Sequence, residues 1–118
     1  MKVLIVDDHE GFRASARRML EADGFEVVAE AGSGAEALQA ADTWSPELVL
    51  LDVYLPDLQG FDVAERLTGN GSAPAIVLTS SHDASDFGPL VERSGARGFI
   101  PKSDLSGEAL RRILDEQP

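Results

Sequence analysis

The chain contains no cysteine among its 118 residues. Disulfide bonds and thiolate metal sites are therefore excluded, and the composition is compatible with a reducing compartment. The sequence also lacks an apolar run long enough to cross a membrane. Its first apolar run, 3–6, is too short for a signal peptide and is followed by acids. We therefore expect a cytoplasmic protein that does not bind a membrane.

Basic side chains are also scarce, with 10 Lys and Arg against 21 Asp and Glu and a formal net charge of −11. Binding to a nucleic-acid backbone depends on basic side chains that neutralise phosphates. This balance argues against direct nucleic-acid binding by this domain. It suits instead the binding of cations or of a basic protein surface.

Apolar runs and helical faces alternate along the chain, and 43% of the residues are hydrophobic, which is enough for a real core. We expect strands at 3–6, 25–31, 48–52, 75–78 and 97–101, each followed by a helix. That alternation predicts an α/β fold in which helices cover both faces of a parallel sheet. No repeat or linker interrupts the pattern, so we expect one domain spanning residues 1–118.

Several residues mark where the helices begin and end. Gly24 is suited to a left-handed cap that ends the first helix. Ser33 and Glu36 have the spacing of a capping box, and Ser106 can cap the last helix. Pro89 is tolerated only in the first turn of a helix, so we expect the fourth helix to begin late, near 87–89.

The stretch 48–56, with sequence LVLLDVYLP, organises the chain. Its apolar run is typical of a strand buried on both faces, and it ends on Asp52. A carboxylate is rarely buried unless it is paired. Open parallel sheets bind their ligands just outside the carboxyl ends of the strands, where Asp52 is expected to lie.

Other chemically useful side chains also follow strands and should meet Asp52 at one edge of the sheet. They are Asp7, Asp8, Ser80 and Lys102. Three carboxylates repel one another unless a cation joins them, and oxygen ligands favour Mg²⁺ or a similar hard cation. One carboxylate could then attack phosphorus while the cation and a lysine neutralise charge.

Four motifs support this interpretation together, although none would do so alone: VDDH at 6–9, LLDVYLPDLQG at 50–60, IVLTSS at 76–81 and GARGFIPK at 95–102. With them the chain resembles the receiver domains of bacterial two-component response regulators, in particular NarL/FixJ-like receivers, over essentially its whole length. The resemblance implies a flavodoxin-like, doubly wound sheet of five parallel strands in the order 2-1-3-4-5, flanked by five helices.

The resemblance also implies roles for individual residues. Asp52 would be the phosphoacceptor, Ser80 the switch hydroxyl, Lys102 the phosphate contact and Phe99 the aromatic switch. The implied Mg²⁺ ligands are Asp8, Asp52 and the backbone carbonyl of Tyr54, with Asp7 acting through water.

The implied function is signalling rather than enzymatic turnover of a separate substrate. A histidine kinase or a small phosphodonor would phosphorylate Asp52, and the surface of the fourth helix, fifth strand and fifth helix would then control an output domain or a downstream protein. Phosphorylation-dependent homodimers are a further implication. The sequence leaves open whether the domain stands alone or belongs to a longer protein with a DNA-binding output domain.

Three positions differ from the usual receiver pattern or leave a choice open. Ser103 follows Lys102, where many receivers have a proline joined by a cis peptide bond, so that geometry stays open. Phe99 replaces the commoner tyrosine and offers no hydroxyl. Thr79 directly precedes Ser80, and the spacing to Lys102 favours Ser80 as the switch residue.

Other side chains have simpler interpretations. We expect Trp44 and Phe61 to be packing residues, and His9 and His82 to be surface or loop residues. The final helix should present a solvated face of local ion pairs, formed by Glu108, Arg111, Arg112, Asp115 and Glu116. Two hypotheses concern the surroundings of the site: Tyr54 and His82 flank the path of water to the phosphoryl group and slow its loss, and the segment 83–88 is mobile.

Three other functions compete with the receiver interpretation. A receiver-like module regulated by protein contact alone would not need all five chemical positions filled, as they are here. A flavodoxin-type FMN carrier needs a phosphate loop after the first strand, where Asp7, Asp8 and Glu10 would repel a phosphate. A phosphatase of the haloacid-dehalogenase type needs a second aspartate where Tyr54 stands.

Overall fold

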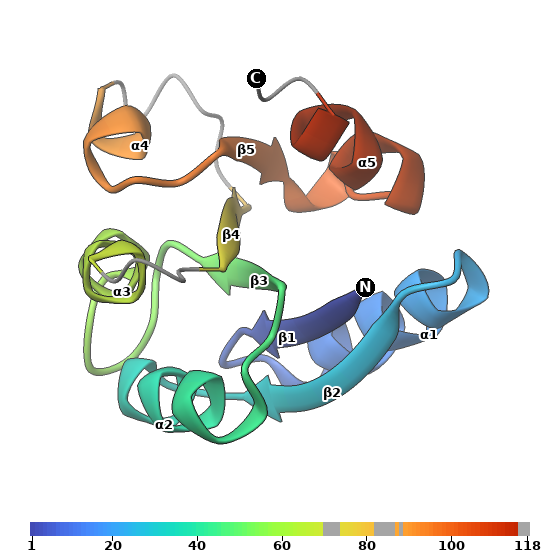
Figure 1. The fold of residues 1–118 in the computed structure, drawn as a ribbon, viewed down its shortest axis with the longest axis horizontal. Coiled ribbons are helices and arrows are strands. Elements are labelled where there is room, and N and C mark those ends of the chain that lie inside the picture. Colours follow the sequence, from blue (N-terminus) through green and yellow to red (C-terminus); the bar gives the residue numbers. More distant parts are fainter. Residues whose placement is uncertain (70–73, 82–86, 88, 116–118) are drawn as a thin grey trace.

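The computed structural model describes residues 1–69, 74–81, 87 and 89–115. Strands and helices alternate along these residues (Figure 1). The elements are β1 (Lys2–Val6), α1 (Glu10–Ala22), β2 (Glu26–Ala31), α2 (Gly34–Trp44), β3 (Leu48–Asp52), α3 (Gly60–Thr68), β4 (Ala75–Ser80), α4 (Leu90–Arg93), β5 (Gly98–Pro101), a 3₁₀ helix η2 (Lys102–Asp104) and α5 (Gly107–Asp115).

The five strands form one parallel sheet in the order β2-β1-β3-β4-β5, which confirms the expected topology. Helices α1 and α5 cover one face, and α2, α3 and α4 cover the other (Figure 1). The carboxyl ends of all strands therefore open on one edge, and the order changes direction between β1 and β3, where such sheets place their ligands.

The two cores alternate along each strand because successive side chains point to opposite faces of a sheet. In β3, Leu48 and Leu50 pack on the α1/α5 side, whereas Val49 and Leu51 pack on the α2/α3/α4 side. Every residue of β3 is buried, as expected for a central parallel strand. The same alternation decides on which side of the sheet the polar residues at the strand ends lie.

The helix boundaries follow the signals in the sequence. Gly24 has φ +91°, the left-handed conformation expected after α1. The Ser33 side chain accepts a hydrogen bond from the Glu36 backbone N–H at 3.2 Å, and Ser106 accepts one from Ala109. Helix α4 begins at Leu90, directly after Pro89, so its late start is confirmed.

Two predictions about packing had different outcomes. Phe61, in the first turn of α3, is buried in the core, as expected. The prediction that Trp44 is a packing residue is wrong, because its side chain lies at the end of α2 with 51% of its surface exposed.

His82 and nearly all of the segment expected to be mobile lie outside the described residues, so those hypotheses stay predictions. Among the described residues, no helix is both long and apolar enough to cross a bilayer.

Candidate functional site

Two aspartates at adjacent strand ends form the floor of the site. Asp52 is the last residue of β3, and Asp7 directly follows β1, where its backbone N–H bonds to the carbonyl of Ala31 at 3.0 Å. Because side chains alternate along a strand, those of Asp7 and Asp52 lie on the face of the sheet that α1 and α5 cover. Asp7 is fully buried, Asp52 is 4% exposed, and Asp8 is exposed to solvent.

Lys102 contacts both of these acids from the end of β5, at the edge of the sheet. It begins η2 immediately after β5, and its ammonium lies 2.6 Å from Asp7 Oδ2 and 3.2 Å from Asp52 Oδ2. The contact with Asp52 is also a hydrogen bond that Lys102 donates. The ion pair therefore links residues that are far apart in the sequence.

Burial and charge shift the proton affinities of these groups. Burial raises the pKa of Asp52, and the negative charge of Asp7 raises it further, although a hydrogen bond from the Tyr54 N–H and the charge of Lys102 oppose both effects. Burial alone would lower the pKa of Lys102, but its contacts with Asp7 and Asp52 together outweigh burial and raise it. Lys102 is therefore a fixed positive charge beside a carboxyl that is costly to ionise.

The acids at this edge form a group that fits a hard cation. One ligand atom from each of Asp7, Asp8, His9 and Asp52 lies within 4.8 Å of the others. Within the described part of the chain, the buried Asp7 Oδ2 has no hydrogen-bond donor other than the Lys102 ammonium, which lies 2.6 Å away. A buried carboxylate oxygen with unused acceptor capacity is what a Mg²⁺ site requires.

His9 is exposed, as expected, yet it is part of this cluster. Its backbone N–H donates to Asp7 Oδ1 at 2.8 Å, and its ring Nδ1 lies 3.2 Å from Asp7 Oδ1 and 3.1 Å from Asp8 Oδ1. The ring sits at the mouth of the site rather than among its buried ligands.

The two candidate hydroxyls lie on different sides of the sheet. Thr79 pairs in register with Asp52 and follows the strand row of Val77 on the α1/α5 side. Ser80 lies one residue nearer the open edge, is buried, and pairs with Pro101, the residue before Lys102. Phe99 packs against the α2/α3/α4 core, the side that Ser80 faces by strand alternation.

An aromatic cluster that the sequence did not predict lies beside the site. The buried ring of Phe87 is centred 6.0 Å from Tyr54, 5.5 Å from Phe61 and 5.3 Å from Phe99. Such separations are typical of favourable ring pairs. The cluster therefore connects Tyr54, two residues after Asp52, with the ring at the expected switch position.

A second unpredicted contact anchors the loop between β3 and α3. Asp57 accepts hydrogen bonds from the backbone N–H groups of Gly34 at 2.7 Å and Ala35 at 3.0 Å. These bonds lower the pKa of the Asp57 carboxyl, since they favour its charged form. A local sequence pattern could not reveal this contact, because the cap and the helix it caps are separated by a whole strand.

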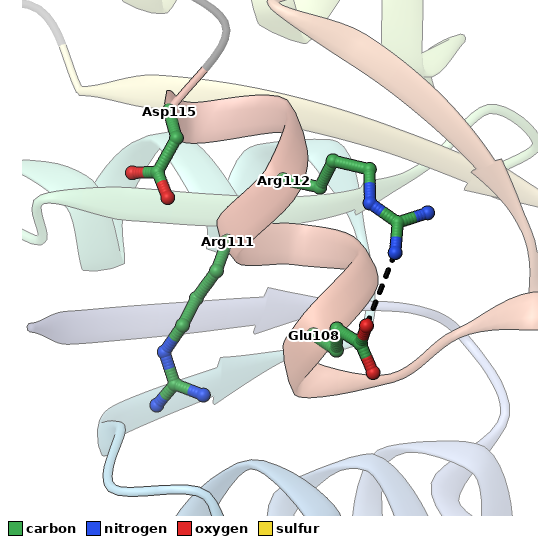
Figure 2. Close-up of a pocket in the computed structure, with 4 residues that line it drawn as sticks. All are labelled: Glu108, Arg111, Arg112 and Asp115. Atoms are coloured by element: carbon green, nitrogen blue, oxygen red, sulfur yellow. Dashed lines mark hydrogen bonds and ion pairs between the residues drawn. The ribbon is translucent and has the colours of Figure 1, made fainter.

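The exposed face of α5 carries one of the local ion pairs that the sequence predicts, and Glu116 lies outside the described residues. Arg112 bonds to Glu108 at 3.1 Å beside a shallow pocket of about 350 Å³ (Figure 2). Arg111 extends away from this pair in Figure 2, and it donates to the Asp23 carbonyl and lies over the Phe25 ring. Arg111 therefore fastens α5 to the turn after α1 instead of joining the local pairs.

Sequence comparison decides the family to which this fold and site belong. The sequence model of the response regulator receiver domain matches residues 3–115. The chain belongs to the response regulator receiver domain family. As a receiver domain of two-component signalling, it is a signalling module and not a catalytic enzyme.

Two curated relatives of this receiver domain are a response regulator and a putative transcriptional regulator. The chain is 41% identical over 115 residues to the nitrate/nitrite response regulator protein NarP of Escherichia coli, covering 96% of this chain and 53% of that protein. It is 39% identical over 109 residues to a putative transcriptional regulator of Pseudomonas aeruginosa, covering 92% of this chain and 53% of that protein. The receiver domain thus spans about half the length of these curated relatives.

Solved receiver domains share the fold closely. The signal receiver domain of NarL from Mycobacterium tuberculosis has a TM-score of 0.86 at 32% identity, covering 97% of this chain and 93% of that chain. A LuxR-family response regulator from Aurantimonas has a TM-score of 0.86 at 30% identity, covering 97% of this chain and 82% of that chain. These likenesses agree with the NarL-like character of the sequence motifs.

Proposed function

We propose that this receiver domain accepts a phosphoryl group on the Asp52 carboxylate, as one step of a two-component signalling system. One observation carries the proposal: Asp52 is a buried acid, placed 3.2 Å from the Lys102 ammonium and grouped with Asp7 and Asp8. A carboxylate in such surroundings is kept for chemistry rather than for stability, because burying it costs free energy.

The transfer is a displacement at phosphorus. An Asp52 oxygen forms a bond to phosphorus while the bond to the donor breaks: P–N for a phosphohistidine of a histidine kinase, P–O for acetyl phosphate. The electron pair of the broken bond leaves with the donor group: the ring nitrogen of the histidine takes up a proton, whereas acetate leaves as the anion. Lys102 neutralises charge on the phosphoryl oxygens, and Ser80 donates a hydrogen bond to one of them.

The residues that would hold Mg²⁺ are Asp7, Asp8, Asp52 and the backbone carbonyl of Tyr54. When bound, Mg²⁺ supplies positive charge that offsets the negative charge of the transferring group. The donor set supports this choice of metal, since hard oxygen ligands with solvent access suit Mg²⁺. Asp8 is the acid at this site most open to solvent and offers the side from which the ion would enter.

The signal would pass to the surface formed by α4, β5 and α5. The phosphoryl group adds about −1.5 to −2 charge next to Lys102. We propose that Ser80 and Lys102 move towards this charge and that Phe99, packed on Phe87, changes its position in response. The partners would be a histidine kinase and an output domain or downstream protein in the cytoplasm, with a phosphorylation-dependent homodimer as one form of output.

The test is the intact mass of the protein after incubation with acetyl phosphate, with and without Mg²⁺. We expect a gain of one phosphoryl group that requires Mg²⁺ and is absent in Asp52→Ala. Asp62→Ala removes an exposed acid of α3 and should leave the gain unchanged. A gain that persists in Asp52→Ala would show that Asp52 is not the acceptor.

Absence of a mass gain would have two meanings that Mg²⁺ binding separates. If the folded protein binds no Mg²⁺, the domain acts as a binding module regulated by protein contact alone. If it binds Mg²⁺ but gains no mass, the purified histidine kinase is the donor to test, and failure there would overturn the proposal.

A further inference from the structure

The Lys102 ammonium has a third neighbour besides its two carboxylates. It lies 4.6 Å from the centre of the Phe12 ring, over the face of the ring. Aromatic faces carry partial negative charge and attract a cation at this distance. Lys102 is thus enclosed by Asp7, Asp52 and Phe12, and its side chain is 16% exposed.

The fold explains why a residue of α1 reaches a residue of η2. Phe12 is in the first turn of α1, which begins just after the acidic residues at the end of β1. Asp7 and Asp52 follow the strand rows that face α1 and α5, and Phe12 packs on that same side of the sheet. A large side chain at position 12 therefore lies directly above the space that the Lys102 ammonium occupies.

We propose that Phe12 is a positioning residue that holds the Lys102 ammonium over the phosphoacceptor. This inference rests on the proposed function and adds a residue to it. During transfer, Lys102 must exchange contacts with carboxylate oxygens for contacts with phosphoryl oxygens. A ring face can hold the cation during this exchange, because it attracts the charge without neutralising it.

The Phe12 ring also excludes water from one side of the Lys102 ammonium. An ammonium in water is well hydrated, and its flexible four-carbon stem can adopt many positions. Phe12 covers one side of the ammonium with apolar surface, which strengthens the attraction of Lys102 for nearby negative charge. A third carboxylate at this position would instead draw Lys102 away from the phosphoryl group.

Two substitutions that change the ring face test the proposal. Phe12→Leu removes the face, and 3,4,5-trifluorophenylalanine at position 12 keeps the shape while it withdraws electron density. We expect Mg²⁺-dependent phosphorylation by acetyl phosphate to slow about fivefold in Phe12→Leu, and to a similar extent in the trifluoro protein. A trifluoro protein as fast as the native one would overturn the role of the ring face.

A double-mutant cycle separates positioning from packing. In a Lys102→Met background, Phe12→Leu should change the residual phosphorylation rate less than twofold, because there is no cation left to hold. An equal fivefold loss in both backgrounds would mean that Phe12 acts only through packing, and the inference would be wrong. Phe25→Leu is the matched control, since Phe25 makes a similar contact with Arg111 away from the site.

Two further readouts complete the test. The Cε protons of Lys102 should show an upfield ring-current shift in NMR spectra of the native protein, and Phe12→Leu should remove that shift while circular dichroism stays unchanged. If the native protein accepts no phosphoryl group from any donor, the proposed function fails. If it does and the Phe12 series has the native rate, only this inference fails.

Discussion

The carboxylate of Asp57 accepts a hydrogen bond from the backbone N–H of Gly34 at 2.7 Å, so a loop residue caps a helix that comes earlier in the chain. The Gly34 position also lacks room for a side chain, since an added Cβ would lie 2.8 Å from Leu58 Cδ1. The loop that follows Asp52 is therefore tied to α2 by both a hydrogen bond and close packing.

Removal of the Asp57 charge should make the protein less stable in a pH-dependent way. The folded-state pKa of Asp57 is lowered, so its stabilising contribution is complete above the unfolded-state pKa and is lost as pH falls through the folded-state pKa. We expect Asp57→Asn to unfold at lower urea concentration at pH 7, and the difference from the native protein to shrink in acid. The control is Glu65→Gln, an exposed acid of α3 that should have no such effect.

The charge of Asp52, unlike that of Asp57, should destabilise the folded protein. Its pKa is raised, so folding stability falls as pH rises from the unfolded-state pKa through the folded-state pKa. Without Mg²⁺ at pH 7, we expect Asp52→Asn to be more stable than the native protein by about 1 kcal/mol. Thermal unfolding at several pH values measures this, and a variant less stable than the native protein at pH 7 would contradict it.

Addition of Mg²⁺ should make the native protein more stable than Asp52→Asn. A ligand that binds only the folded state raises stability according to its concentration relative to Kd. We expect the melting temperature of the native protein to rise with Mg²⁺ and that of Asp52→Asn to rise less. Equal rises in both proteins would place the ion away from Asp52.

Gly60 should be essential for the geometry of the phosphoacceptor. A Cβ at this position would collide with the backbone oxygen of Asp52 and lie 2.9 Å from Val53 Cα. Backbone atoms of a buried strand cannot move aside cheaply, so Gly60→Ala should slow phosphorylation and destabilise the fold by about 1–3 kcal/mol. Gly11→Ala, which adds a Cβ in open space on α1, should be neutral or slightly stabilising.

The contrast between Phe87 and Trp44 can be measured directly. Phe87 is buried among three other rings, so Phe87→Ala should cost about 3–5 kcal/mol in unfolding free energy. Trp44 is half exposed, and Trp44→Ala should change stability by no more than about 0.5 kcal/mol. Urea titrations compare the two, and similar losses would show that the cluster around Phe87 has no special role in stability.

The order of the elements and the residues at the strand ends follow from the sequence alone. An apolar run such as 48–51 predicts a buried strand. Gly24, Ser33 and Ser106 mark helix ends through contacts or backbone conformations within a few residues. Parallel strands place their carboxyl ends on one edge of the sheet. The proximity of Asp7, Asp52 and Lys102 could therefore be predicted from the sequence. These are local rules and simple topological consequences of them.

Which distant side chains meet around that edge depends on the three-dimensional packing. The contacts of Phe12 with Lys102, of Asp57 with Gly34 and of Phe87 with Phe99 join elements that are separate in sequence. Each depends on the angle and distance at which a helix packs on the sheet, which hydrophobic periodicity does not specify. Trp44 shows the same limit, since its burial depends on whether a neighbouring element extends far enough to cover it.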